Sequence, residues 1–507
     1  MTYLLSILIL PILASIIVNI YRSKITIVRY VPILCSLISL LIISLFTYLQ
    51  YFSSSQVFNP QIMLYQLFPT LGISMSFITN KISIALLFLA NITIITALYS
   101  TLKTEKRLNE INTLILLISV GIYGLILADD LFVFFLFYEI AVVPMFLMIM
   151  NWGYNLDREV SGPFSKILNY LSVGTKNYGA YKITLYLLFG SLLIFFGVAI
   201  IGIQGGTFSI SALSSSNEIS STKNILAFFL LLVGFGSHSA LWPFHTWVPD
   251  GHGTAPTAGS IIFAGILMKI GVIGFIKVII PILGLEFVQY KTLLIILASI
   301  NIIYGAFTAM MQDDLKYLAA YASLSHIGYI FLALAMYSHI GMIGAITQTI
   351  SHGLIICLLF YSVGLIHKIK NTRSISQLSS MLDNSPNLAY VFIFAAFASI
   401  GFPLTSGFIA EFLIMLSVYL SEQYLLLFVP IFGILITTLY MFRTVKKICF
   451  RFISSDNTNK DLDVEDKTIV YLLIILICLI GIFPSFLTEF INIDSYYILN
   501  EAGSWKN

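Results

Sequence analysis

The amino-acid sequence predicts an all-α polytopic membrane protein. Of its 507 residues, 59% are hydrophobic and only 10% are charged, whereas soluble domains carry about 25% charged residues. The mean hydropathy is +0.97, and apolar runs long enough to cross a bilayer, about 20 residues each, recur from one end of the chain to the other. These observations exclude a water-soluble fold and predict a single membrane domain over residues 1–507.

The apolar segments predict about fourteen transmembrane helices. They lie near residues 3–20, 31–52, 82–100, 111–128, 131–151, 183–203, 224–249, 257–280, 292–311, 315–337, 340–366, 388–420, 424–442 and 468–488. Most of the 26 lysines and arginines fall in alternate loops between these segments. Because cytoplasm-like loops hold the excess of Lys and Arg, both termini are expected on the opposite side. The first segment has no basic region before it and no cleavage site after it, so we expect a retained helix and not a signal peptide.

Helix breakers interrupt two of the long segments, the seventh and the twelfth. The breakers are Pro243, Pro249 and Gly251 in the seventh segment, and Gly401, Pro403 and Gly407 in the twelfth. Broken helices in corresponding positions, five helices apart, are typical of transporters built from two inverted repeats, because freed backbone groups are tolerated only where protein or water satisfies them. We therefore expect peripheral helices at 3–100, five-helix repeats at 111–280 and 292–448, and a last helix and tail at 468–507.

The sequence contains no motif for a cofactor, a metal or a nucleotide. Its four cysteines, Cys35, Cys357, Cys449 and Cys478, lie in or beside apolar runs without a CxxC pair, which is typical of packing residues. No GxGxxG follows a strand, no P-loop is present, and no basic stripe indicates nucleic acid. We expect no cofactor, metal or nucleic acid to bind this chain.

Two charged residues lie in the middle of apolar helices. Glu139 is in FYEIAVVPM, and Lys269 is in IIFAGILMKIGVIG. A charged side chain at the bilayer centre costs about 2.5–3.5 kcal/mol on insertion scales, and such residues usually mark ion pathways. We interpret Glu139 as a proton-loading or coupling carboxylate, with a structural ion pair as the alternative. Lys269 is interpreted as a lysine that desolvation prepares for proton exchange.

Two histidines and a second glutamate extend this set. His326, in AAYASLSHIGYI, and His352, in QTISHGLIICLLF, lie on consecutive predicted helices and are expected to face each other. Histidine titrates near neutral pH and can relay a proton through either ring nitrogen, although a packing role is an equal alternative. Glu411, in SGFIAEFLIML, follows the break of the twelfth segment, where a carboxylate would line a cavity.

Other polar residues have simpler interpretations. His238, His245 and His252 cluster around the first break, but spacings of seven do not place them on one helical face, so we do not expect a metal site. Charged residues at predicted helix ends are interpreted mainly as interfacial anchors that complement the termini. They are Asp129, Asp130, Asp313, Asp314 and Lys316.

Four of these segments, FHTWVPDGHGTAPTAGS, DDLKYLAAYASLSHIGYI, FYEIAVVPM and GFIAEF, resemble the antiporter-like proton-pumping subunits of respiratory complex I. The resemblance runs from about residue 102 to residue 447. In that family, charged residues on helices 5, 7, 8 and 12 and central histidines form a hydrated proton path along the membrane midplane. Matched residue by residue, the resemblance implies a path through Glu139, His238, Lys269, His326, His352 and Glu411.

Two of these positions carry further information. A glutamate at the position of Glu411 resembles the chain 4 branch of the family, whereas related pump chains and multisubunit Na+/H+ antiporters usually carry lysine there. His238 stands where the family has its helix 7 lysine. A histidine is neutral at pH 7 far more often than a lysine, so a fixed cationic partner for Glu139 is not expected.

The resemblance implies a subunit of an H+-translocating NADH:ubiquinone reductase that holds no redox centre itself. Flavin and iron–sulfur clusters are then expected in partner subunits, and the partners are other membrane-arm and peripheral subunits and membrane lipids. The alternative function is a cation/proton (Na+/H+) antiporter without electron transfer. Residues with AT-rich codons are frequent, so we expect the mitochondrial inner membrane, with the termini on the intermembrane-space side, or else the bacterial plasma membrane. The long loop at 151–182 is expected to contact another subunit.

Overall fold

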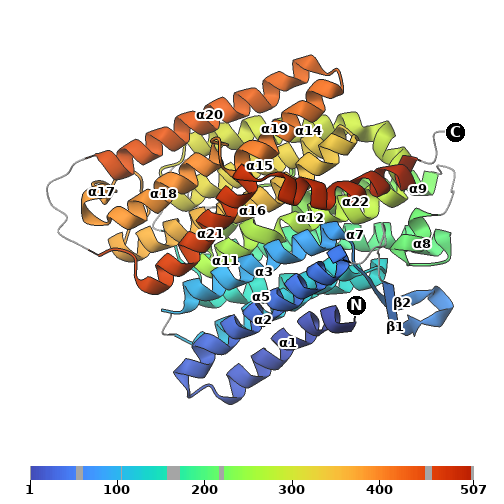
Figure 1. Cartoon of the computed structure of the whole chain (residues 1–507), viewed down its shortest axis with the longest axis horizontal. Helices are drawn as coiled ribbons and strands as arrows, with labels where there is room; N and C mark the ends of the chain where they lie inside the picture. The colour runs from blue at the N-terminus through green and yellow to red at the C-terminus, as the bar shows by residue number, and fades with distance from the viewer. Residues whose placement is uncertain are drawn as a thin grey trace.

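Long α-helices lie side by side in the protein, and most of them run along a common direction (Figure 1). The structure, a computed structural model, describes residues 2–52, 61–103, 106–156, 172–215, 222–451 and 460–503. Within these residues, 10 helices are long and apolar enough to span a membrane, or up to 11 if the bent pair Val464–Ile482 and Ser485–Leu499 is one span. The all-α membrane fold is confirmed. The expected count of about fourteen spans and the inverted repeats stay predictions.

The bounds of the elements are as follows. The first part of the chain contains α1 (Thr2–Ile20), α2 (Ile25–Phe52), β1 (Gln61–Phe68), η1 (Pro69–Leu71), β2 (Ile73–Ile78), α3 (Lys81–Thr101), α4 (Leu108–Leu127), α5 (Leu131–Trp152), α7 (Lys176–Gly205), α8 (Ile210–Ser214), α9 (Thr222–His238) and α10 (Trp247–Thr254). One span, Thr257–Ile282, contains α11 (Thr257–Ile262), the π-helix η2 (Phe263–Leu267), α12 (Lys269–Gly274), the π-helix η3 (Phe275–Ile279) and α13 (Ile280–Ile282). The remainder contains α14 (Gly284–Met310), α15 (Leu315–Ala335), α16 (His339–Lys370), α17 (Met381–Asn384), α18 (Pro386–Ser399), α19 (Ser406–Leu420), η4 (Tyr424–Leu427), α20 (Phe428–Val445), the π-helix η5 (Lys446–Phe450), α21 (Val464–Ile482) and α22 (Ser485–Gly503).

Short polar side chains determine where several spans begin. Asp130 accepts hydrogen bonds from the backbone N–H groups of Phe132 and Val133 at the start of α5. Asp314 does the same for Lys316 and Tyr317 at the start of α15. Such N-caps satisfy orphan backbone donors, so both aspartates complement a helix terminus as predicted, but Asp130 is 0% exposed and is not an interfacial anchor.

Both predicted interruptions are present. The chain leaves α9 after His238 and enters α10 at Trp247, and it leaves α18 after Ser399 and enters α19 at Ser406. The Trp247 indole N–H donates to the Ser237 carbonyl (3.0 Å), which satisfies a freed carbonyl at the first break. The two π-helices on either side of α12 were not predicted.

Three parts of the fold differ from the sequence-based expectation. An antiparallel hairpin, β1 with β2, precedes α3 and was not predicted. The helix α3 is not peripheral, because its apolar window is 89% buried and it packs on α4, α11 and α16. The expected tail after α21 is a helix, α22, which is bent by 69° from α21 because Pro484 at the junction cannot continue the ladder of backbone hydrogen bonds. The predicted contact loop at 151–182 lies outside the described residues at 157–171.

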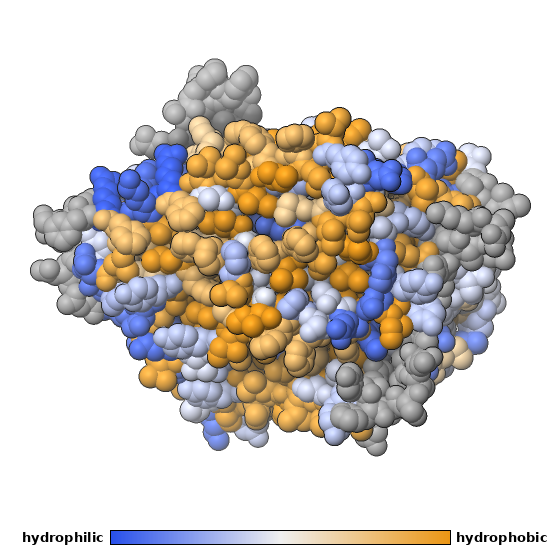
Figure 2. All heavy atoms as spheres, turned by 45° about the horizontal axis from the view of Figure 1, so that its top comes forward, coloured by the Kyte–Doolittle hydropathy of each residue, from blue (hydrophilic) through white to orange (hydrophobic). Residues whose placement is uncertain are grey.

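The outer surface of the bundle is suited to lipid. Figure 2 shows hydrophobic side chains across the middle of the face that carries α20, with hydrophilic side chains gathered toward its ends. On α20, the outward residues include Ile431, Leu435 and Leu439, which are 52%, 53% and 56% exposed. An apolar band between polar ends is what a bilayer requires of a spanning protein.

Candidate proton path

Three of the predicted residues meet in the interior of the bundle. The ring centroids of His326 on α15 and His352 on α16 are 5.3 Å apart, and His326 Nδ1 lies 3.7 Å from Glu411 Oε1 on α19. Their exposed fractions are 6%, 3% and 4%. The distance of 3.7 Å is longer than a hydrogen bond, so a proton would pass after a small side-chain shift or through a bridging water. The expected proximity of the two histidines is therefore present, and Glu411 adjoins His326.

The break between α18 and α19 places Glu411 at this cluster. Gly401, in the break, has φ +75°, in the left-handed region that glycine adopts without steric cost. A Cβ added to Gly401 would lie 2.3 Å from Glu411 Oε2, which leaves no room for a side chain. A hydrogen bond from Ser351 Oγ to Ser406 Oγ (2.8 Å) joins α16 to the first residue of α19. The glycine turn thus leaves room for the carboxylate, and the α16 contact fixes the start of the helix that carries it.

Lys269 is fully buried, with 0% of its surface exposed. Only Met268 separates it from the end of the π-helix η2. In η2 the Met268 N–H bonds to the Phe263 carbonyl, five residues earlier (3.0 Å), whereas in an α-helix it would bond to the Ala264 carbonyl. The Lys269 ammonium donates to that Ala264 carbonyl. Met268, next to Lys269 in the chain, lies 3.8 Å from the Ser323 hydroxyl of α15 (Sδ to Oγ), so the lysine lies beside the helix that carries His326.

His238 is the last residue of α9 and is 2% exposed. Its Nδ1 lies 2.8 Å from the Gly234 carbonyl, its ring packs edge-on against Tyr138 with centroids 4.4 Å apart, and its Nε2 has no hydrogen-bond partner among the described residues. A small cavity of about 10 Å³ adjoins His238, Tyr138 and the η2 residues Phe263 and Leu267. His238 therefore lies between α5 and the span that carries Lys269.

Glu139 is not enclosed by this chain. It is half-buried, it accepts a hydrogen bond from the Ser191 hydroxyl of α7, and it forms no ion pair with the described residues. Its neighbours on the outer face of α5, Leu136 and Val143, are 41% and 55% exposed. His238 contacts Tyr138 and the Gly234 carbonyl, and no hydrogen bond or ion pair among the described residues joins it to Glu139.

The three histidines around the first break face three different neighbours. His238 packs against Tyr138, His245 against Tyr304 with centroids 4.8 Å apart, and His252 is stacked on Phe360 at 4.6 Å. Within the described residues, no group of three His, Cys, Asp or Glu side chains is arranged to hold a metal ion. The break is therefore lined by separate histidines that do not converge on one point.

Lys316 was interpreted as an interfacial anchor, and that interpretation is wrong. Its side chain is 0% exposed, and its ammonium donates to the Ala255 carbonyl at the end of α10 (2.6 Å). The reason is that α15 is buried on all sides, with 94% of its apolar window inside the protein, so the first turn of α15 lies within the bundle. The signal in the sequence was the run of small residues that follows, YLAAYAS, which allows close packing around the whole helix.

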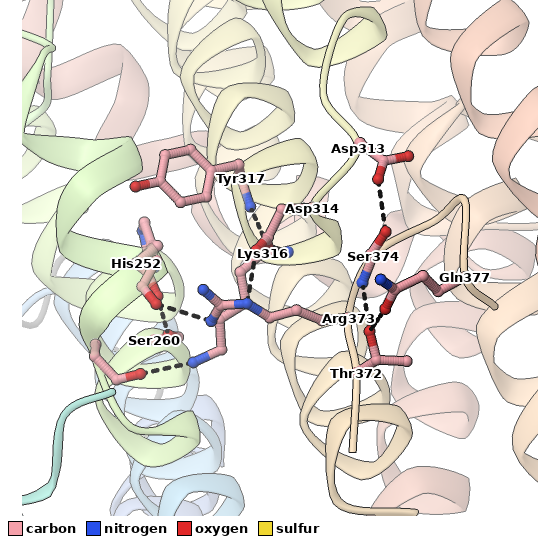
Figure 3. A network of polar contacts seen from close by, with 12 residues as sticks. His252, Ser260, Asp313, Asp314, Lys316, Tyr317, Thr372, Arg373, Ser374 and Gln377 are labelled. Carbon is pink, nitrogen blue, oxygen red and sulfur yellow. Dashed lines mark hydrogen bonds and ion pairs between the residues drawn. The ribbon is translucent and has the colours of Figure 1, made fainter. Parts of the chain in front are cut away.

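A polar network around Lys316 ties α10 to α15 and to the loop after α16 (Figure 3). Arg373 Nε pairs with Asp314 (2.6 Å) and its Nη1 donates to the Gly253 carbonyl (2.8 Å). In α10, Asp250 accepts from the Tyr317 hydroxyl (2.9 Å) and pairs with Lys182 of α7 (2.6 Å). The broken segment is therefore anchored at one end by charged groups from three other elements.

Broken helices around buried titratable groups form the architecture of ion-transporting membrane proteins. The chain belongs to the family described as NADH:quinone oxidoreductase/Mrp antiporter, whose transmembrane model matches residues 128–437. It is 30% identical over 427 residues to NADH-quinone oxidoreductase subunit M of Rhodobacter capsulatus, which covers 82% of this chain and 80% of that protein. It is 32% identical over 402 residues to the protein of the same name from Rickettsia prowazekii (strain Madrid E), covering 78% and 77%. The expected subunit type agrees with these names.

Two solved structures share the fold at low sequence identity. The first is a chain of respiratory complex I from Thermus thermophilus with bound NADH, with a TM-score of 0.84, 23% identity, and 99% of each chain covered. The second is a chain of the Mrp complex from Dietzia sp. DQ12-45-1b, with a TM-score of 0.83, 18% identity, and 98% of each chain covered. The arrangement of helices is therefore common to a chain of respiratory complex I and a chain of the Mrp complex.

Proposed function

We propose that this chain is a proton-translocating membrane-arm subunit of respiratory complex I, of the subunit M or chain 4 type. Electron transfer from NADH to ubiquinone takes place in partner subunits, which carry the flavin and the iron–sulfur clusters, and this chain moves protons. The observation that carries the proposal is the buried cluster of His326, His352 and Glu411 at the second broken helix. Ionisable side chains cost free energy inside a membrane, and those that occur there usually mark a functional site.

The proposed path runs from Glu139 past His238 to Lys269, and then through the central cluster to Glu411. A change of charge at Glu139 alters the free energy of the proton on His238 and Lys269, because Coulomb interactions are weakly screened in a low-dielectric interior. Lys269 adjoins Met268, which contacts Ser323 of α15, and in our proposal the charge of Lys269 passes that change to His326 and His352. The proposed repeats, 111–280 and 292–448, place the two ends of this path in different halves of the chain.

The membrane proposed for this chain is the mitochondrial inner membrane, with both termini on the intermembrane-space side. The relatives described above are bacterial proteins, and the bacterial plasma membrane is the alternative. Figure 1 shows α1 beginning and α22 ending toward the same end of the bundle, which supports an even number of crossings.

Replacement of Glu139 by Gln tests the path at its start. The amide carbonyl of the new side chain can still accept the hydrogen bond from Ser191, so the complex is expected to assemble, but the amide cannot ionise. NADH-driven proton pumping is expected to fall by about a hundredfold or more, as for the loss of a proton-transferring group. The matched control is Glu489→Gln, because Glu489 is an exposed glutamate on α22 and lies outside the path.

The measurement is proton uptake per NADH oxidised in membranes, together with co-migration of the subunits on a native gel. Pumping at the wild-type level in an assembled Glu139→Gln complex would refute the role of Glu139. A Glu489→Gln variant that loses pumping equally would show that the loss reflects glutamate removal in general and not the path.

The second candidate is a cation/proton antiporter that acts without electron transfer, and the shared fold with the Mrp chain supports it. Purification from native membranes separates the two. Co-isolation with flavin and iron–sulfur subunits favours the first function, and Na+/H+ exchange by a preparation free of redox subunits favours the second.

A further inference from the structure

A cavity of about 130 Å³ opens at the ends of α14 and α20, away from the proton path. It is lined by Met310 and Met311 at the end of α14 and by Tyr440, Arg443, Thr444 and Lys447 on α20 and η5. These ends belong to the side on which most lysines and arginines fall. The cavity therefore lies where the apolar surface of the bundle meets its basic loops.

The cavity offers positive charge that the protein does not neutralise. Arg443 is exposed and Lys447 is half-buried, and neither forms an ion pair with a described residue. Asp313 also lines the cavity, and its carboxylate accepts hydrogen bonds from the hydroxyls of Ser374 (2.6 Å) and Ser376 (2.8 Å) and from the Ser376 N–H (3.0 Å). Because these neutral donors leave its charge in place, the cavity holds two cations against one carboxylate, and one positive charge remains available to an anion from outside the chain.

Arg443 and Lys447 are suitable donors for a phosphate. Both line the cavity, and charged donors such as these form the strongest hydrogen bonds to phosphate oxygens. These two cations form a donor set that is suited to a phosphate group.

The surface that continues from the cavity is apolar. Met311 beside the cavity is 77% exposed, Phe442 and Leu439 on α20 are 48% and 56% exposed, and Phe307 on α14 is 42% exposed. Phe307 packs against Phe432 of α20 with ring centroids 5.9 Å apart, so the two helices form one continuous apolar surface. A ligand with a phosphate head and long apolar chains matches both parts of this site, whereas free phosphate would use only the cations.

We infer that the cavity between α14 and α20 binds the headgroup of an anionic phospholipid, with the acyl chains against the apolar surface of these two helices. Basic pockets between transmembrane helices on the cytoplasm-like side recognise such headgroups. Each cation near the membrane surface contributes about 1 kcal/mol to this attraction, which is about fivefold in affinity. This inference does not depend on the direction or the route of proton movement.

The test uses the intact complex, delipidated in detergent and titrated with mixed micelles that contain phosphatidylglycerol or phosphatidylcholine. The readout is the lipid concentration that restores half of the thermal stability, together with the phospholipid retained per complex. The double variant Arg443→Gln with Lys447→Gln is expected to raise the half-restoring phosphatidylglycerol concentration about 25-fold and to leave the phosphatidylcholine response unchanged. The matched control is Lys446→Gln, because Lys446 is an exposed neighbour that does not line the cavity.

Three results would overturn the inference. An unchanged phosphatidylglycerol response in the double variant would show that the cavity does not bind the headgroup. An equal loss in Lys446→Gln would show unspecific attraction of a basic surface to anionic lipid. Restoration of stability by inorganic phosphate as effectively as by phosphatidylglycerol would assign the site to free phosphate. A Phe307→Ala variant should weaken the binding of phosphatidylglycerol but not the binding of inorganic phosphate. It therefore distinguishes a phospholipid site from a free-phosphate site in a folded protein.

Discussion

Gly401 gives the sharpest test of the central cluster, because it limits where Glu411 can lie. In a Gly401→Ala variant, the new Cβ would lie 2.3 Å from Glu411 Oε2. To reach an ordinary contact of about 3.4 Å, the carboxylate must retreat by about 1.1 Å. Glu411 Oε1 lies 3.7 Å from His326 Nδ1, so a displacement of this size changes the geometry of proton transfer between the two side chains. A misplacement of about 1 Å can cost about a hundredfold in rate, and we expect pumping to fall by about ten- to hundredfold.

Backbone strain must be separated from this displacement. Alanine at a φ of +75° adds about 1–2 kcal/mol of strain, and strain alone can lower the amount of folded protein. Gly206 supplies the matched control, because its φ is +65° and a Cβ there would meet nothing within 4 Å. Gly206→Ala therefore carries a similar backbone cost and leaves the cluster untouched.

The assay measures proton pumping per NADH oxidised in membranes with equal amounts of assembled complex. The expected result is a large loss for Gly401→Ala and wild-type pumping for Gly206→Ala. The reasoning is refuted if Gly401→Ala pumps normally, because Glu411 would then not need its present position. It is also refuted if both variants lose pumping to the same extent, because backbone strain would then account for the effect.

Two further predictions concern stability. Lys316→Met removes the donor to the buried Ala255 carbonyl and should lower the stability of the complex by about 1–3 kcal/mol, seen as a lower thermal midpoint; an unchanged midpoint would contradict it. The hydrogen bond from Lys103 holds the pKa of Asp463 below its ordinary value. The stabilisation by this pair is therefore complete at pH values above the unfolded carboxyl pKa of about 3.9. It is lost as the pH falls through the lower pKa of the folded state. Because Asp463 is 68% exposed, the difference between wild type and Asp463→Asn should be at most about 1 kcal/mol at pH 7 and vanish in acid; a difference that persists there would argue against the pair.

The helices and their breaks were predictable because each has a local cause. A run of apolar residues of membrane length has one stable arrangement in a bilayer, since every backbone group must be bonded within the segment. Proline and glycine interrupt this backbone hydrogen bonding, so Pro243 and Gly401 indicated the two interruptions. Adjacent helices in the sequence also pack together, which is why the proximity of His326 and His352 could be expected.

The environment of each charged residue was less predictable, because it depends on packing around helices that are apolar on every side. The helix α5 has no polar face, so its sequence could not indicate that Glu139 is half-buried on the outer surface. Lys316 follows a helix cap and has the sequence of an interfacial lysine, yet α10 and the loop after α16 cover it. In both cases, the deciding contacts come from residues distant in the sequence.

The π-helix η2 has a consequence for the comparison of this chain with its relatives. A π-helical turn contains one residue more than the α-helical turn that it replaces, and each residue rotates a helix by about 100°. Deletion of one codon within Phe263–Leu267 would therefore convert the π-helical turn into an α-helical turn and leave the direction of Lys269 relative to α11 nearly unchanged. The same deletion in an α-helical part of the span would turn the residues that follow by about 100°. Relatives can thus differ by one residue between the APTAGS segment and the lysine and still place the lysine at the same point in the bundle.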